Sequence, residues 1–221
     1  MIKLAARDTP RYRPYRDRKE FDEMATEVLE HVNETTDEQR LTRRPATIEE
    51  FRALSESLLH IEYINGEIIM APSPSVAHQS LARNIFRALD KFVGKKIRGE
   101  LFFSPLDVVL PSGDVVQPDI FFLSEDDAKR AKEDDRVRCA PLLAVEILSP
   151  GSITHDAITK RELYEQNGVR EYWIVDAEKR AVAQLVLRKK HYALTELGEG
   201  DAIKGAVLSG FEMKVGELLG S

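Results

Sequence analysis

The sequence contains a single cysteine, Cys139, and its five histidines are scattered without an HxxxH pair. An internal disulfide is therefore excluded, and so are a thiolate zinc cluster and a CxxC redox pair. No apolar run approaches the ~20 residues that span a bilayer, and residues 1–20 have no apolar signal core. These absences predict a cytoplasmic protein with no membrane partner.

The sequence also lacks an excess of basic residues. It has 32 Lys and Arg against 38 Asp and Glu, a net charge of -6 over 221 residues. A protein whose whole surface clamps nucleic acid is therefore excluded, whereas a local basic cleft is compatible with this composition. Hydrophobic residues make up 43%, which suffices for one good core but not for two large domains.

The charges at the N-terminus are arranged in blocks. Lys and Arg predominate in residues 1–19, and residues 20–39 contain Asp and Glu but no Lys or Arg. Apolar residues recur at helical spacing between Phe21 and Val32, which predicts an amphipathic helix. We expect residues 1–45 to form a charged extension that contains this helix and docks on the domain or on a partner subunit. An arm that contacts DNA phosphates is the alternative.

Residues 46–221 have the pattern of one α/β domain with a mixed sheet. Thr47 and Glu50 form a capping box before an apolar helix, and Asn65-Gly66 between two apolar runs predicts a hairpin. Helices are expected at about 76–93, ending at Gly94, and at about 156–167. Further strand-like runs lie at 97–104, 106–110, 115–123, 141–150, 171–176, 181–187 and 191–197.

Two carboxylates lie inside apolar strands: Glu146 in "LLAVEIL" and Asp119 before "IFFL". A buried carboxylate is costly unless it is paired, protonated or bound to a cation. Two that converge raise each other's pKa unless a divalent cation lies between them, and oxygen-rich sites of this kind suit Mg²⁺ or Mn²⁺. Each carboxylate alone could instead form a buried salt bridge or reach solvent at the end of the sheet.

A lysine lies on the same face of the following helix as an acid and a tyrosine. Asp156, Lys160 and Tyr164 are spaced four residues apart, and the helix starts shortly after the Glu146 strand. Lys160 could therefore reach an anion bound near the end of that strand. The alternative is a salt bridge between Lys160 and Asp156. Carboxylates for a metal and a lysine that positions water are the parts of a phosphodiester hydrolase.

The segments "QPDI", "AVEILSPGS" and "GVREYWIVD", with D-x-x-x-K-x-x-x-Y before the last, carry a family resemblance. The chain resembles the PD-(D/E)XK nuclease superfamily, and most of all its large bacterial branch of restriction-endonuclease domains of unknown function. The resemblance covers residues 47–187. It implies a restriction-endonuclease-like mixed sheet flanked by helices, Mg²⁺-dependent endonucleolytic cleavage of DNA, and a homodimer or larger symmetric assembly.

The resemblance also implies roles for individual residues. Asp119 and Glu146 match the motif acids, which makes them catalytic and metal-binding. Leu148 stands where the motif has its lysine, so the resemblance assigns the catalytic amine to Lys160 from the next helix. Further residues expected near the site are Glu67, His78, Asp107, Asp156 and Tyr164.

Two of these additional residues have open alternatives. His78, near the start of a predicted helix, could instead cap that helix or lie in the core. The side on which Asp107 lies depends on strand register: pairing Leu110 with Val115 puts Leu106 opposite Asp119, whereas a slip of one residue puts Asp107 there.

Two hypotheses follow for the function. The first is a Mg²⁺- or Mn²⁺-dependent DNA endonuclease that uses Asp119, Glu146 and Lys160. The second is a catalytically inactive module that keeps the nuclease fold for DNA binding or protein assembly, and the missing motif lysine favours it.

Overall fold

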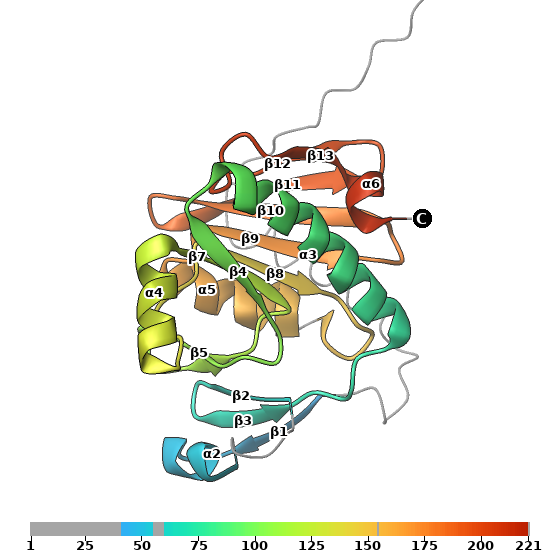
Figure 1. Ribbon diagram of the computed structural model, residues 1–221. Helices are drawn as coiled ribbons and strands as arrows, with labels where there is room; N and C mark the ends of the chain where they lie inside the picture. Colours follow the sequence, from blue (N-terminus) through green and yellow to red (C-terminus); the bar gives the residue numbers. More distant parts are fainter. Residues whose placement is uncertain (1–40, 55–59, 154, 221) are drawn as a thin grey trace, which may run out of the picture.

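The computed structural model describes residues 41–54, 60–153 and 155–220 (Figure 1). The helix expected between Phe21 and Val32 lies outside the described residues. At the end of the predicted extension, strand β1 (Thr42–Pro45) pairs with β3 (Glu67–Met70), so the folded part includes these four residues. Within the described ranges, no helix has both the length and the apolar character to cross a membrane.

Two sheets form the framework of the molecule. The larger has six strands in the order β11-β10-β9-β8-β7-β4, in which β8 and β9 are parallel and the other neighbours antiparallel. Its strands are β4 (Gly99–Phe103), β7 (Ile120–Ser124), β8 (Leu143–Ile147), β9 (Glu171–Asp176), β10 (Ala181–Arg188) and β11 (His191–Gly198). The predicted mixed sheet is therefore confirmed.

The smaller sheet has five strands in the order β1-β3-β2-β6-β5. It adds β2 (Ile61–Ile64), β5 (Val108–Val109) and β6 (Val115–Val116) to β1 and β3. A two-stranded ribbon of β12 (Ala202–Lys204) and β13 (Glu212–Lys214) completes the strands of the described chain. The helices are α2 (Ile48–Leu54), α3 (Val76–Lys96), α4 (Glu125–Asp134), η2 (His155–Lys160), α5 (Arg161–Asn167) and α6 (Val215–Leu219).

The two faces of the larger sheet belong to different cores, because side chains alternate along each strand. In β8, Leu143, Val145 and Ile147 pack in the core that contains α3, whereas Ala144 packs in the core that contains α5. Figure 1 shows α3 and α5 on opposite sides of this sheet. Glu146 alternates in step with Ala144, so it points to the side of η2 and α5.

The smaller sheet is also divided between two faces. Ile64, Ile69 and Val116 lie in the same core as α5, and the opposite face packs on Phe51 of α2. In β2, Glu62 lies two residues before Ile64 and therefore on the α5 side. The two sheets thus present Glu62 and Glu146 to the same helical segment.

Local signals in the first half of the domain are largely confirmed. The capping box is present, with Thr47 N donating to Glu50 Oε2 at 2.7 Å and Glu50 N donating to Thr47 Oγ1 at 3.2 Å. The hairpin turns at Asn65 and Gly66, whose φ values of 52° and 81° suit a tight Asn-Gly turn. The expected helix end at Gly94 is wrong: α3 continues through Lys96, because one glycine near a helix end is tolerated when the apolar face continues to pack.

The β5–β6 pair has neither of the two registers considered from the sequence. Val109 pairs with Val115, so the register continued by two residues puts Asp107 opposite Gln117. The predicted strand over 115–123 is interrupted at Gln117-Pro118: its first part pairs in the smaller sheet and its second in the larger. A proline cannot donate to a strand ladder, which explains why the chain changes sheets at this point.

Candidate active site

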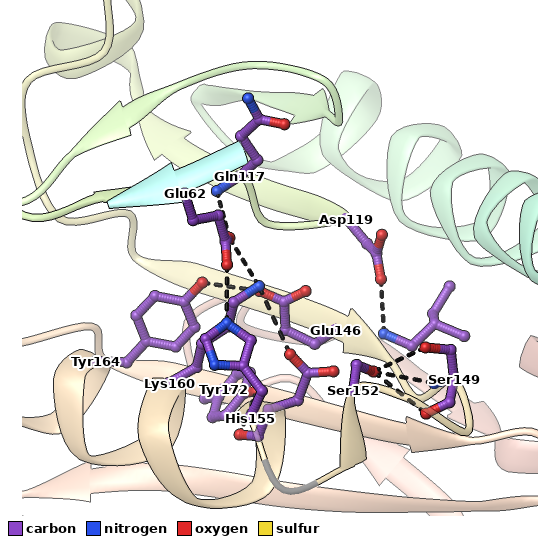
Figure 2. A network of polar contacts seen from close by, with 12 residues as sticks. Glu62, Gln117, Asp119, Glu146, Ser149, Ser152, His155, Lys160, Tyr164 and Tyr172 are labelled. Carbon is purple, nitrogen blue, oxygen red and sulfur yellow. Dashed lines mark hydrogen bonds and ion pairs between the residues drawn. The ribbon is translucent and has the colours of Figure 1, made fainter. Parts of the chain in front are cut away.

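Glu146 is the buried carboxylate of β8 and has only 3% of its surface exposed. Its Oε1 accepts hydrogen bonds from Lys160 Nζ at 2.9 Å and from the Tyr164 hydroxyl at 2.8 Å. Both donors come from the helical segment that crosses from β8 to β9, as Figure 2 shows. Lys160, which was expected to reach the end of the Glu146 strand, therefore lies there and binds Glu146 itself.

Lys160 is itself buried, with 4% of its surface exposed, and lies among three acids. Its Nζ lies 2.9 Å from Glu62 Oε1, 2.9 Å from Glu146 Oε1 and 3.6 Å from Asp156 Oδ1. Lys160 ends η2, a π-helical stretch that continues as α5. Such stretches are rare and occur frequently at functional sites. The salt bridge to Asp156 expected as the alternative exists as well, but it is the longest of the three contacts.

Glu62, from β2 of the smaller sheet, belongs to this network and was not among the residues expected from the sequence. Besides Lys160, its carboxylate accepts from Gln117 N at 2.8 Å and lies 2.9 Å from His155 Nε2. Arg43 Nη2 lies 3.0 Å from His155 Nδ1. Arginine only donates, so Nδ1 accepts and a neutral ring carries its proton on Nε2, toward Glu62.

Asp119 immediately precedes β7 and approaches the end of β8. Ile120 pairs with Val145, so the register continued by one residue puts Asp119 opposite Glu146. Directly opposed residues point to the same face of a sheet. Asp119 Oδ2 accepts from Ile147 N at 2.8 Å and lies 3.2 Å from His78 Nε2 (Figure 2 shows the first contact).

The electrostatics of the site are those of crowded carboxylates around one ammonium. Burial raises the pKa of Glu146 well above its ordinary value, and the charges of Asp156 and Asp119 add to this effect. Burial also raises the pKa of Asp156. Glu62 differs: burial opposes its ionisation, but the Lys160 ammonium and the hydrogen bond from His155 lower the pKa of Glu62 below its ordinary value.

The pKa of Lys160 is shifted in the direction that keeps its charge. Burial by itself favours the neutral amine, but Glu146, Glu62 and Asp156 together raise the pKa of Lys160 well above its ordinary value. The site thus holds an ionised lysine and retains more acidic groups than this single ammonium can neutralise.

The additional residues expected from the sequence lie at different distances from this network. Tyr164 contacts Glu146 directly, and Asp156 contacts Lys160. His78 contacts Asp119, and Asp107 accepts a 2.8 Å hydrogen bond from Gln117 Nε2. Glu67 does not contact Glu146 or Lys160: it is partly exposed, and its carboxylate lies 3.9 Å from Arg43 Nη1, so it is linked to His155 only through Arg43.

The oxygen atoms offered by the acids of this site are of the kind that bind a hard divalent cation. Asp119 and Glu146 supply carboxylate oxygens that face the same side of the sheet. Burial is the main cause of the raised pKa of Glu146, and a bound cation would offset it by stabilising the ionised carboxylate. Within the part of the chain that the structure describes, no cluster of three or more His, Cys, Asp or Glu side chains forms a ready metal site. A cation here would therefore also need backbone or water oxygens.

Comparison with known proteins places this geometry in context. Residues 48–216 match the model of the Uma2 family, which is described as "Putative restriction endonuclease". No curated protein matches the chain. A crystal structure from Anabaena variabilis ATCC 29413, described as a "putative nuclease belonging to DUF820", is similar with a TM-score of 0.69 and 19% identity. The match covers 79% of this chain and 98% of that chain, and it confirms the restriction-endonuclease-like fold.

Proposed function

The chain belongs to the Uma2 family, and on this premise we propose that it is a nuclease that hydrolyses phosphodiester bonds of DNA with a divalent cation, Mg²⁺ or Mn²⁺. The observation that carries the proposal is the 2.9 Å contact between Lys160 Nζ and Glu146 Oε1. The family motif requires an amine beside its second acid, and Leu148 does not provide one. Lys160 reaches that position from the crossover helix.

Each residue of the network has a proposed task. Asp119 and Glu146 hold the cation, which, when bound, stabilises negative charge on the scissile phosphate. Lys160 keeps an ammonium beside Glu146, where it orients a water molecule and offsets charge that develops in the transition state. Tyr164 fixes the carboxylate plane of Glu146 through its 2.8 Å hydrogen bond.

Glu62 has a supporting role in this proposal. It contacts Lys160 from the smaller sheet, and Gln117 N and His155 hold its carboxylate in place. Lys160 is thereby held from two sides, so its ammonium has little freedom to leave the site. Precise placement matters because a displacement of about 1 Å costs roughly 10²-fold in rate.

The experiment is a cleavage assay on supercoiled plasmid with Mg²⁺ or Mn²⁺. The wild type is expected to nick or linearise the plasmid. The near-isosteric variants Asp119→Asn, Glu146→Gln and Lys160→Met should each lower the rate by about 10²- to 10³-fold, the scale of one lost transition-state contact. Lys190→Ala removes a charge from an exposed turn and should cleave as the wild type does. Absence of cleavage with either ion, or equal cleavage by all variants, would contradict the proposal.

The second candidate is an inactive module of the same fold that binds DNA or another protein. The burial of Lys160 between two carboxylates favours it, since an amine that is fully engaged in ion pairs can serve structure alone. Plasmid binding by the wild type in a gel-shift assay, without cleavage under any metal condition, is the result that would select this candidate. In either case we propose a symmetric homodimer, because a twofold pair matches the two strands of a duplex.

A further inference from the structure

His155 is a buried residue that joins strand β1 to the candidate active site. It is only 3% exposed, and its two ring nitrogens contact side chains from different strands. Nε2 lies 2.9 Å from Glu62 Oε2, as Figure 2 shows, and Nδ1 lies 3.0 Å from Nη2 of Arg43 on β1. Glu62 Oε1 in turn lies 2.9 Å from the Lys160 ammonium. Three contacts in series therefore connect Arg43 with the proposed catalytic amine.

Strand β1 directs Arg43 to this side of the smaller sheet. β1 pairs with β3 at the edge of the sheet, and Arg43 lies opposite Ile69. Directly opposed residues point to the same face, and Ile69 packs in the core that contains α5. The next residue, Arg44, lies opposite Ile68, which packs in the core on the other face. Of the two neighbouring arginines, only Arg43 is therefore on the face of His155.

Arg43 determines which nitrogen of His155 carries the proton. A guanidinium has only donors, so its contact needs the lone pair of Nδ1, and the proton of the neutral ring then lies on Nε2. Nε2 consequently donates to Glu62. Without Arg43, a ring protonated on Nδ1 alone would place a lone pair against the Glu62 carboxylate. A doubly protonated ring would instead compete with Lys160 for the negative charge of Glu62, so both alternatives weaken the hold on Lys160.

We propose that Arg43 is a positioning residue for this site: by fixing the tautomer of His155, it keeps Glu62 in the orientation that holds Lys160. This inference rests on the proposed function, since it concerns the placement of the amine assigned there. Arg43 precedes residues 48–216, which match the family model, so it is an addition of this chain to the family region. Groups that orient the ligands of a metal site contribute about 10- to 100-fold to activity, and an effect of this size is expected here.

The first measurement needs neither DNA nor a metal ion. Proton–nitrogen correlation spectra of the full chain, labelled with nitrogen-15 at histidine and lysine, report the protonation of each ring nitrogen. His155→Gln identifies the His155 signals by their loss. In the wild type at neutral pH, His155 should be neutral with its proton on Nε2. In Arg43→Met this state should give way to the other tautomer or to the imidazolium, and the Lys160 ammonium should exchange its protons with water faster.

The second measurement is a double-mutant cycle on plasmid cleavage, compared per folded molecule. Arg43→Met should lower kcat by about 10- to 100-fold with little change in KM. His155→Gln supplies an amide donor to Glu62 that no longer depends on Arg43, so in this background Arg43→Met should cost less than about 3-fold. Arg44→Met is the matched control: Arg44 is exposed and its Nη1 donates to Pro45 O at 3.4 Å, so this variant should behave as the wild type does in both measurements.

Each outcome decides between positioning and a merely structural arginine. An unchanged Nε2 tautomer of His155 in Arg43→Met would overturn the inference and leave the nuclease proposal standing. An equal cost of Arg43→Met with and without His155→Gln would overturn it as well. If the wild type does not cleave plasmid, the nuclease proposal fails, whereas the His155 tautomer and the proton exchange of Lys160 still decide whether Arg43 positions the amine.

Discussion

Replacement of Lys160 by methionine tests whether the buried ammonium holds the site together. The substitution removes the charge and keeps a side chain of similar length, so the expected loss is electrostatic and not due to a cavity. In the wild type, Nζ lies within 2.9 Å of both Glu62 and Glu146 and within 3.6 Å of Asp156. All three acids are at most 3% exposed. In the variant these three buried carboxylates would therefore have no ammonium to balance their charge.

The size of the expected stability loss follows from the burial of these ion pairs. Breaking a buried ion pair by removing one partner costs about 3–5 kcal/mol, because the remaining charge is left uncompensated. This loss is a large part of a typical domain stability of roughly 5–15 kcal/mol. We therefore expect Lys160→Met to fold but to unfold at clearly lower denaturant concentration, so its cleavage rate must be compared per folded molecule.

The pKa shifts of the buried acids determine how the stability loss of Lys160→Met changes with pH. In the wild type the pKa of Glu62 lies below its unfolded value, so its stabilising contribution is present above that value and decreases as the pH falls. Without Lys160, burial raises the pKa of these carboxylates, so the folded variant binds more protons than the unfolded chain and gains stability as the pH falls. The deficit of the variant should therefore be largest near pH 8 and smaller near pH 5.

The assay is urea unfolding monitored by fluorescence of Trp173, the only tryptophan, which is fully buried. Lys190→Met serves as the matched control because Lys190 is exposed. A deficit of Lys160→Met below about 1 kcal/mol at pH 8, within the range of a surface pair, would refute the reasoning. A deficit of equal size at pH 5 and pH 8 would refute it as well.

Two further predictions concern residues outside the site. Burial and the nearby charge of Asp127 raise the pKa of Cys139 to about 11. At pH 8 a thiol reagent should therefore label Cys139 about 100-fold more slowly in the folded protein than in urea, because the thiolate is the reactive form. Equal labelling rates would contradict this prediction. Glu171, fully buried, accepts four hydrogen bonds, so Glu171→Ala should lower the free energy of unfolding by at least ~3 kcal/mol and leave plasmid cleavage per folded molecule unchanged.

The position of Lys160 near the end of the Glu146 strand was predictable because both parts of the signal are local. An acid in an apolar run marks an unusual buried charge, and a lysine on the inward face of the next helix marks a cation that can come near it. The short connection between strand and helix keeps the two close in space. Sequence spacing was therefore sufficient to place Lys160 near the end of that strand, whereas its hydrogen bond to Glu146 is found in the structure.

Glu62 was missed although it carries a similar signal, an acid between Ile61 and Tyr63. Glu67 was favoured instead, from the other strand of the same hairpin. Both acids lie on one face of the hairpin, since Glu67 pairs with Ile64 and Glu62 is two residues before Ile64. Which end of that face meets Lys160 depends on how the smaller sheet packs against η2, and hairpin periodicity contains no information on this.

The position of Asp107 depended on a similar non-local choice. The β5–β6 register is set by a few residues around a turn, and a shift of one residue redirects the side chain. The observed pairing of Val109 with Val115 directs Asp107 to Gln117, whose main-chain nitrogen in turn contacts Glu62. Asp107 therefore reaches the network only through an intermediate residue.

Because Glu62 comes from the smaller sheet, it can contact Lys160 only when that sheet is packed against the larger one. Glu62 and Glu146 belong to separately hydrogen-bonded sheets, and Lys160 joins them through two contacts of 2.9 Å. Thermodynamic linkage is reciprocal. If packing of the smaller sheet makes the free energy of ligand binding more favourable, the bound ligand makes the free energy of sheet packing more favourable by the same amount. We therefore expect a change that loosens the packing of β1 or α2 on the smaller sheet to weaken the binding of any ligand that requires the assembled site.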